Sequence, residues 1–243
     1  MSDLAATGGW RPVLVESGLL PMEARQLAPG GELGDGIVEV PSNVLLLQGA
    51  EQTVLIDAGS GSLAEEWPGG HADLAGALER AGSGVDEIDV VVVTHLDFDH
   101  FGGALDLARA RVAIPSTAEP SSPAGEQALA KLEAAGRVDR IEDGGAPVPG
   151  LTVRSAPGHR SGHSIVEIGG DLVHLADVVH HTEHVTNPDW DRVFDSDVQL
   201  ALVTRTAVLD EMARRGVMVT ASHITGAGRI EPGGDGTLHW QPV

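Results

Sequence analysis

The residues best suited to chemistry form one short block, His95-Leu96-Asp97-Phe98-Asp99-His100. The four valines at 90–93 come just before it and predict a short, fully buried strand. On an extended backbone His95 and Asp97 point the same way, while Asp99 and His100 follow where the chain can turn back. Such a cluster suggests a metal site, although a polar loop that happens to be rich in His and Asp is the alternative.

Further imidazole and carboxylate groups follow other predicted strands, which we expect over 53–56, 151–155, 172–175 and 217–221. The groups that come after them are Asp57, His159, Asp177 and His223. Taken alone, Asp57 would be a turn residue whose carboxylate accepts backbone N–H bonds. Strand ends in a layered α/β domain converge on one edge, so we expect these groups to meet the 95–100 block there.

Predicted helices alternate with these strands. An amphipathic helix is expected over 71–81, and a longer one is expected to begin at an Asp195-Ser196 cap and to end at Arg215 before Gly216. We see no linker or repeat, and 243 residues suit one α/β domain, so the prediction is a single domain over 1–243.

Composition narrows the chemistry. The sequence has no cysteine, so a metal must be held by imidazole and carboxylate, and the absence of disulfides fits a cytoplasmic protein. There is no apolar run of membrane-spanning length and no signal-peptide pattern at the start. Location in the cytoplasm is therefore the expectation.

The formal charge of −21 and the single lysine, Lys131, argue against nucleic acid and anionic membranes as partners. We expect instead a small neutral or partly apolar substrate. A homodimer is left open as the assembly.

Five features of the chain occur together in one order. They are Asp57 after a strand, the block 95–100, Pro157-Gly158-His159, Asp177 after a strand, and His223 after the last core strand. With them the chain resembles a metallo-β-lactamase-fold metallohydrolase. The Gly-rich N-terminal portion, the pair His180-His181 and the segment after His223 are most similar to the branch that holds methyl parathion hydrolase and related lactonases.

This resemblance implies an αβ/βα four-layer sandwich, in which two mixed β-sheets pack face to face with helices outside. It also implies a dinuclear site for two divalent metal ions, with zinc preferred and manganese or iron as alternatives. Matched by position, one ion would be held by His95, Asp97 and His159, and the other by Asp99, His100 and His223. Asp177 would bridge the two ions.

Four more residues receive roles from the resemblance and from their neighbours. Asp57 would accept a hydrogen bond that orients a ligand imidazole, and His163 would support the site without binding metal. His180 and His181 follow Asp177 and are candidates for the substrate pocket.

The sequence departs from the family pattern at Asp97, where the family usually has histidine. A carboxylate there would give the first ion a harder, more negative ligand set, which moves its preference toward Mn²⁺ or Fe²⁺. A second departure is the complete lack of tyrosine. Related lactonases often present a tyrosine to the substrate, so that role would fall to His180, His181, Asp99 or a water.

The function implied is a metal-dependent hydrolase that opens a small ester or lactone, such as an acyl-homoserine lactone. Two ions would hold a hydroxide between them at neutral pH, and Asp99 would be the catalytic carboxylate that orients it and takes its proton. Hydrolysis of organophosphates or phosphotriesters on the same site is one alternative. The other is a non-hydrolytic, iron-binding or silent member of the fold.

Overall fold

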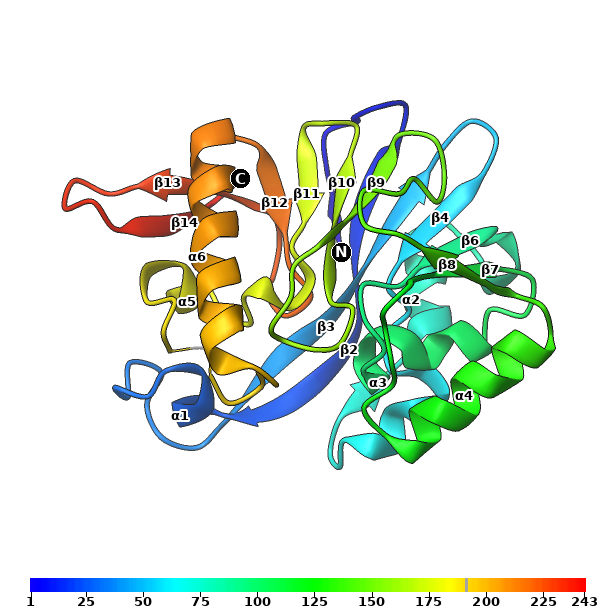
Figure 1. Ribbon diagram of the computed structural model, residues 1–243, viewed down its shortest axis with the longest axis horizontal. Coiled ribbons are helices and arrows are strands. Elements are labelled where there is room, and N and C mark those ends of the chain that lie inside the picture. Colours follow the sequence, from blue (N-terminus) through cyan, green and yellow to red (C-terminus); the bar gives the residue numbers. More distant parts are fainter. Residues whose placement is uncertain (191) are drawn as a thin grey trace.

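The computed structural model describes residues 1–190 and 192–243. Within these residues two β-sheets lie face to face, and helices cover the outer face of each (Figure 1). One side carries α2, α3 and α4, and the opposite side carries α5 and α6. The four-layer sandwich predicted from the sequence is confirmed.

The larger sheet is built from the first part of the chain, and its strands run in the order β1-β2-β3-β4-β6-β7-β8, with β5 paired to β2. Their bounds are β1 Ser2–Asp3, β2 Arg11–Glu23, β3 Ile37–Gln48, β4 Thr53–Ile56, β5 His71–Ala72, β6 Val90–Val92, β7 Arg111–Pro115 and β8 Val138–Ile141. The strands β4, β6, β7 and β8 are parallel, whereas β2 and β3 form a long antiparallel pair. The parallel strands therefore all end at the same edge.

The second sheet has the order β14-β13-β12-β11-β10-β9. Its strands are β9 Leu151–Ser155, β10 Ser164–Ile168, β11 Leu172–His174, β12 Met218–Thr220, β13 Gly228–Pro232 and β14 Leu238–Pro242. The only parallel pair among these described strands is β11 with β12. Both of its strands run toward the edge at which the larger sheet presents the ends of β4 and β6.

The helices are short except for two. The α-helices are α1 Ala24–Leu27, α2 Leu74–Arg80, α3 Phe98–Phe101, α4 Pro123–Ala134, α5 Glu183–Thr186 and α6 Val198–Arg215. The 3₁₀ turns are η1 Gly61–Glu66, η2 Val85–Glu87, η3 Gly102–Leu105 and η4 Ala176–Val178. The first helical segment after β6 is α3 and the first after β11 is η4, and both carry candidate site residues.

The central strands are buried on both faces, which explains their unbroken apolar runs. Leu46 and Val91 face outward into the cluster under α2 and α4, while Leu45 and Val92 face the second sheet. Alternate residues of the same strands thus contribute to two separate cores, one between the sheets and one beneath the helices.

Two helix starts differ from the sequence prediction. The long helix begins at Val198, because Asp197 rather than Asp195 accepts the N–H of Leu200, at 3.0 Å. The earlier one begins at Leu74 with Asp73 as its cap, and the residues just before it form β5. Gly216 ends the long helix in the left-handed region, with φ 61°, as expected.

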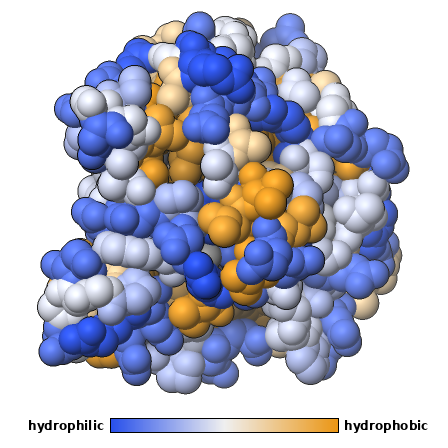
Figure 2. Space-filling view, turned by 60° about the vertical axis from the view of Figure 1, so that its left-hand side comes forward, coloured by the Kyte–Doolittle hydropathy of each residue, from blue (hydrophilic) through white to orange (hydrophobic). Residues whose placement is uncertain are grey.

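The surface is mostly hydrophilic, with a compact apolar area in the middle of the face that Figure 2 brings forward. In the described part of the chain, no helix combines the length and apolar character needed to cross a membrane.

Candidate metal centre

The predicted site residues come together where the two sheets meet at one edge. His95 lies three residues past β6, and Asp99 and His100 are in the first turn of α3. From the second sheet come the groups after β9, β11 and β12, namely His159, Asp177 and His223. All of these side chains are buried, and His95 is fully so.

One oxygen atom is at the centre of the cluster. Oδ2 of Asp177 lies within 3.8 Å of Nε2 of five histidines. The distances are 3.2 Å to His180, 3.3 Å to His100, 3.4 Å to His159 and to His223, and 3.8 Å to His95. Asp99 is beside it, with Oδ2 3.4 Å from Nε2 of His223 and 3.6 Å from Nε2 of His100.

These residues fit divalent metal ions. Nε2 of His95, His100 and His159 and Oδ1 of Asp177 are buried and make no hydrogen bond within the described chain. Leaving such atoms unsatisfied costs about 1–3 kcal/mol each, and metal coordination would satisfy them. The donor atoms form three compact groups, and imidazole with carboxylate is a set that zinc, manganese and iron all accept.

Burial and the surrounding imidazoles shift the pKa values of the two central carboxylates, Asp177 and Asp99, in opposite directions. Burial alone would raise the pKa of the Asp177 carboxyl, but His100, His223 and His180 outweigh it and hold that pKa well below its usual range. Burial also raises the pKa of Asp99, a shift that the neighbouring imidazoles His100 and His223 oppose. Asp177 is thus held as an anion, while Asp99 holds a proton more readily than an ordinary aspartate does.

The imidazoles are fixed from behind through their Nδ1 atoms. Nδ1 of His100 is 2.7 Å from Oδ2 of Asp57, and Nδ1 of His223 donates to the carbonyl of Pro41 at 2.8 Å. Asp57 also accepts the backbone N–H of Thr94 at 2.7 Å and its hydroxyl at 2.9 Å. These bonds place the proton on Nδ1 and leave Nε2 facing inward for a metal.

His159 is fixed in the same way by a residue that the sequence did not reveal. Its Nδ1 is 3.2 Å from Oδ1 of Asp195, whose Oδ2 accepts a 2.9 Å bond from the buried guanidinium of Arg205. Arg205 also donates to the carbonyls of Val178 and Pro188. No local pattern marks Asp195, because its partner lies 36 residues earlier in the chain.

His163 supports the backbone of the central carboxylate. Its Nε2 accepts the N–H of Asp177 at 3.2 Å, and its Nδ1 donates to the carbonyl of Ala156 at 2.7 Å. Burial, together with the nearby His159, lowers the pKa of His163 to about 3. His163 is therefore neutral, and both of its ring nitrogens are used within the protein; its role in supporting the site without binding metal stays a prediction.

Comparison with known proteins identifies the family of this chain. The family model described as the metallo-beta-lactamase superfamily matches residues 37–210, which is more than half of the chain. The chain belongs to the metallo-β-lactamase superfamily. A search of curated proteins gave no match.

Several solved structures share the fold of this superfamily member. AidC, described as a dizinc quorum-quenching lactonase, has a TM-score of 0.83 at 20% identity, over 100% of this chain and 97% of its own. The hydrolase AbOPH also has a TM-score of 0.83 at 20% identity, over 99% and 96%. A variant of AiiA from B. thuringiensis, solved with N-decanoyl-L-homoserine at its active site, has a TM-score of 0.72 at 18% identity, over 90% and 94%.

Asp97, the departure from the superfamily pattern, lies outside the three donor groups formed by the described residues. Its Oδ1 accepts the hydroxyl of Ser121 at 2.6 Å, and its Oδ2 is 2.7 Å from Nε of Arg160. The same Oδ2 is 3.8 Å from Nε2 of His95. Metal coordination by Asp97 stays a prediction. In this structure both of its carboxylate oxygens already have a partner within the protein, Ser121 and Arg160.

The two pocket histidines have different environments. His180 is buried, and its ring lies parallel to that of His223 at 5.3 Å between centroids and 5.1 Å from the ring of His159. His181 is half-buried and faces a separate pocket. His184 joins this loop to α1, because its Nε2 is 2.6 Å from the carbonyl of Leu27.

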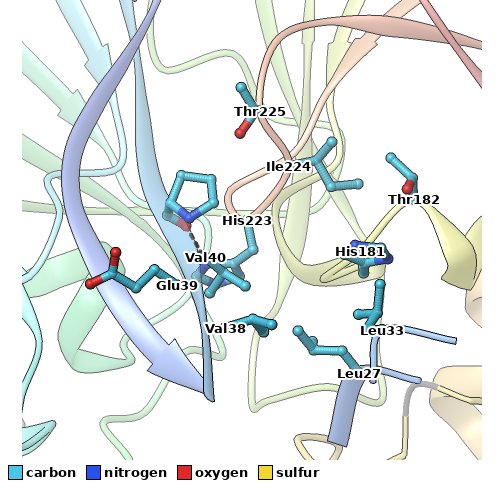
Figure 3. A pocket seen from close by; sticks show the side chains of 11 residues that line it. Leu27, Leu33, Val38, Glu39, Val40, His181, Thr182, His223, Ile224 and Thr225 are labelled. Atoms are coloured by element: carbon cyan, nitrogen blue, oxygen red, sulfur yellow. Dashed lines mark hydrogen bonds between the residues drawn. The ribbon is translucent and has the colours of Figure 1, made fainter. Parts of the chain in front are cut away.

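Two cavities open beside the metal residues and share His223. The smaller, of about 50 Å³, is lined by candidate metal residues, by the ion pair of Asp97 and Arg160, and by apolar side chains. These apolar side chains are Leu20, Met22, Trp67, Phe98 and Phe194. The larger, of about 280 Å³, is lined by the apolar residues Leu27, Leu33, Val38, Val40 and Ile224, with His181, Thr182 and Thr225 among its polar members (Figure 3).

Proposed function

We propose that this protein is a metal-dependent hydrolase that opens a small ester or lactone, with an N-acyl homoserine lactone as the leading substrate class. The observation that carries the proposal is the set of buried imidazole nitrogens gathered around one carboxylate oxygen of Asp177. A buried cluster of this kind has no structural purpose that an apolar core would not serve better.

The ligand sets proposed for the two ions meet at Asp177. His95 and His159 would hold one ion, and Asp99, His100 and His223 the other, which corresponds to two of the donor groups in the structure. When bound, two divalent ions supply a water of lowered pKa as the nucleophile and polarise the carbonyl group under attack. Zinc is the proposed metal, because the AidC lactonase that shares this fold is described as dizinc.

The protein's own contribution to the chemistry is the movement of a proton at Asp99. Water adds to the acyl carbon, the bond from that carbon to the ring oxygen breaks, and the products are a carboxylic acid and an alcohol. Asp99, whose Oδ2 lies beside His223 and His100 and which also lines the smaller cavity, would take the proton of the attacking water and return it to the leaving alkoxide. With no tyrosine in the sequence, Asp99 serves as the proton donor for the leaving oxygen.

The substrate is proposed to be neutral and partly apolar. The walls of the smaller cavity include Leu20, Met22 and Trp67, which suits an uncharged ring, and the larger cavity next to His223 suits an acyl tail. A net charge of −21 would repel a polyanion. Acylated homoserine products are bound in the AidC and AiiA structures, which supports the same substrate class.

The test is a panel of lactones, aryl esters and phosphotriesters offered to the metal-loaded protein. We expect lactone turnover that chelation abolishes and that His100→Ala reduces to background, because His100 lies between Asp57 and the central Asp177. Preferred turnover of phosphotriesters would replace the lactonase proposal by the organophosphate one. If no member of the panel is hydrolysed, the protein is a silent or non-hydrolytic member of the superfamily.

A further inference from the structure

The departure at Asp97 changes the number of imidazoles in the centre. With histidine at that position, the superfamily pattern offers five imidazoles and two carboxylates. In this chain the predicted ligands are four imidazoles, His95, His100, His159 and His223, and three carboxylates, Asp97, Asp99 and Asp177. A third carboxylate would make the centre more negative and the ions weaker as Lewis acids.

The neighbours of Asp97 bind its carboxylate and compete with metal coordination by it. Both of its oxygens have donors, the hydroxyl of Ser121 at 2.6 Å and Nε of Arg160 at 2.7 Å. Arg160 is itself fixed, since it donates to the carbonyls of His159 and Phe194. A guanidinium next to a metal ion is repelled unless an anion stands between them, so Asp97 neutralises Arg160 at the rim of the site.

His180 has the features of a ligand instead. Its Nε2 is 3.2 Å from Oδ2 of Asp177, close to the separation of about 3.3 Å between two ligand atoms on one tetrahedral zinc. His180, Asp177 and His223 form one of the three compact donor groups, with their donor atoms within 4.8 Å of one another. Oδ2 of Asp97 and Oδ2 of Asp177 are both 3.8 Å from Nε2 of His95, so Asp97 is set apart by its bonds to Ser121 and Arg160 and by its place outside the donor groups of the described residues.

The surroundings of His180 also favour a fixed, inward-facing ring. Its side chain is 2% exposed, and its ring lies 5.3 Å from the ring of His223 and 4.9 Å from the ring of Phe194, centroid to centroid. Its backbone N–H donates to Nδ1 of His184, which ties the loop to α1 through Leu27. His180 is thus placed by packing and by the loop, as a metal ligand must be.

We propose that His180 is the fifth imidazole ligand of the metal centre, bound beside Asp177 and His223, and that Asp97 is the ion-pair partner of Arg160 and not a ligand. The proposal rests on the dinuclear centre described under the proposed function. It restores the total of five imidazoles and two carboxylates, with His180 on the side of His223 while Asp97 is on the side of His95.

The experiment compares metal binding, without reference to turnover, in His180→Gln, Asp97→Asn and the control His181→Gln, whose imidazole is the next in the chain and faces the other pocket. Zinc content and affinity are measured against a competing chelator. In the cobalt-substituted protein, the shifted NMR signals of bound imidazoles are counted. Thermal unfolding of each metal-free variant confirms that it is folded.

We expect two ions in the wild type, in Asp97→Asn and in His181→Gln. In His180→Gln we expect the affinity for one ion to fall by more than about 100-fold, beyond the roughly 10–100-fold typical of losing a partner behind a ligand. One imidazole signal should disappear with it. Retention of both ions and all signals in His180→Gln overturns the proposal, as does loss of an ion from Asp97→Asn. Fewer than two ions in the wild type would overturn the dinuclear centre itself.

Discussion

The carboxylate of Asp195 joins His159 to the buried guanidinium of Arg205, with Oδ1 3.2 Å from the imidazole Nδ1 and Oδ2 2.9 Å from the arginine. The long helix α6 therefore supports the centre through one side chain from its second turn. Because the carboxylate selects the tautomer of His159 and fixes its ring, it sets how well Nε2 can bind a metal.

We predict that Asp195→Asn weakens metal affinity by about 10–100-fold, as is typical when the partner behind a ligand imidazole is lost. The amide has nearly the volume of the carboxylate, so the fold should be kept. The measurement is a competition titration with a chelator, and the surface variant Asp189→Asn is the control. Unchanged affinity in Asp195→Asn would mean that His159 does not bind metal through Nε2.

A second prediction concerns the acid stability of the metal-free protein. Burial works against ionisation of Asp57, but His100 and His174 outweigh it and lower its pKa from 3.8 to about 2. Since the folded-state pKa is the lower one, Asp57 stabilises the fold above pH 4. That contribution, roughly 2 kcal/mol, is lost as the pH falls from about 4 to 2.

The corresponding measurement is urea unfolding of wild type and Asp57→Asn across pH 2–5, with the exposed Asp86→Asn as control. We expect the variant to be less stable near neutral pH and to lose less stability between pH 4 and 2. Equal losses in both proteins over that range would show that the buried carboxylate does not carry the pH dependence.

The third prediction concerns metal removal and thermal stability. The metal-free centre leaves Nε2 of His95, His100 and His159 buried without hydrogen bonds in the described chain, so bound ions should stabilise the folded state. At 100-fold excess over Kd an ion contributes about 2.7 kcal/mol, which corresponds to a change in Tm on the order of 5–10 °C for each site. Scans with chelator, and then with zinc restored, should show this fall and its recovery. A Tm that does not respond to chelation contradicts a metal centre of ordinary affinity.

Much of this site could be predicted because its residues follow strands. Buried parallel strands have strong apolar patterns, and their ends share one edge, so Asp57, His95, His159, Asp177 and His223 could be placed together before the fold was known. The sequence did not allow us to predict which ring nitrogen of each histidine faces the site. Whether Nε2 faces inward depends on what stands behind Nδ1, and those partners are distant in the sequence.

The segment between Asp177 and α6 shows where pattern reasoning stops. It has no strong periodicity, and its helix α5 has only four residues, so nothing local indicates that Asp195 reaches His159 or that His180 turns inward while His181 does not. Asp195 was predicted as a helix cap because its residue type suits one, yet Asp197 takes that place. Tertiary contacts decided between two aspartates of equal local propensity.

A fourth prediction tests which cavity holds the acyl tail of the proposed substrate. Val38 lines the larger cavity, and Ile37 next to it on β3 is 65% exposed, because neighbouring strand residues face opposite sides. Val38→Trp should fill part of the cavity, whereas Ile37→Trp adds the same ring outside it. The two variants are therefore matched in residue type and in position along the strand.

We expect Val38→Trp to raise KM for a decanoyl lactone at least ~10-fold, since losing burial of two methylene groups costs about 1.6 kcal/mol. A butanoyl lactone, too short to reach the added ring, should keep its kcat and KM in both variants. Steady-state kinetics on the two substrates give this comparison directly. If Val38→Trp changes the kinetics of both lactones equally, the acyl tail does not lie in the larger cavity. The smaller cavity, whose apolar walls include Trp67 and Phe98, would then be the place for the tail.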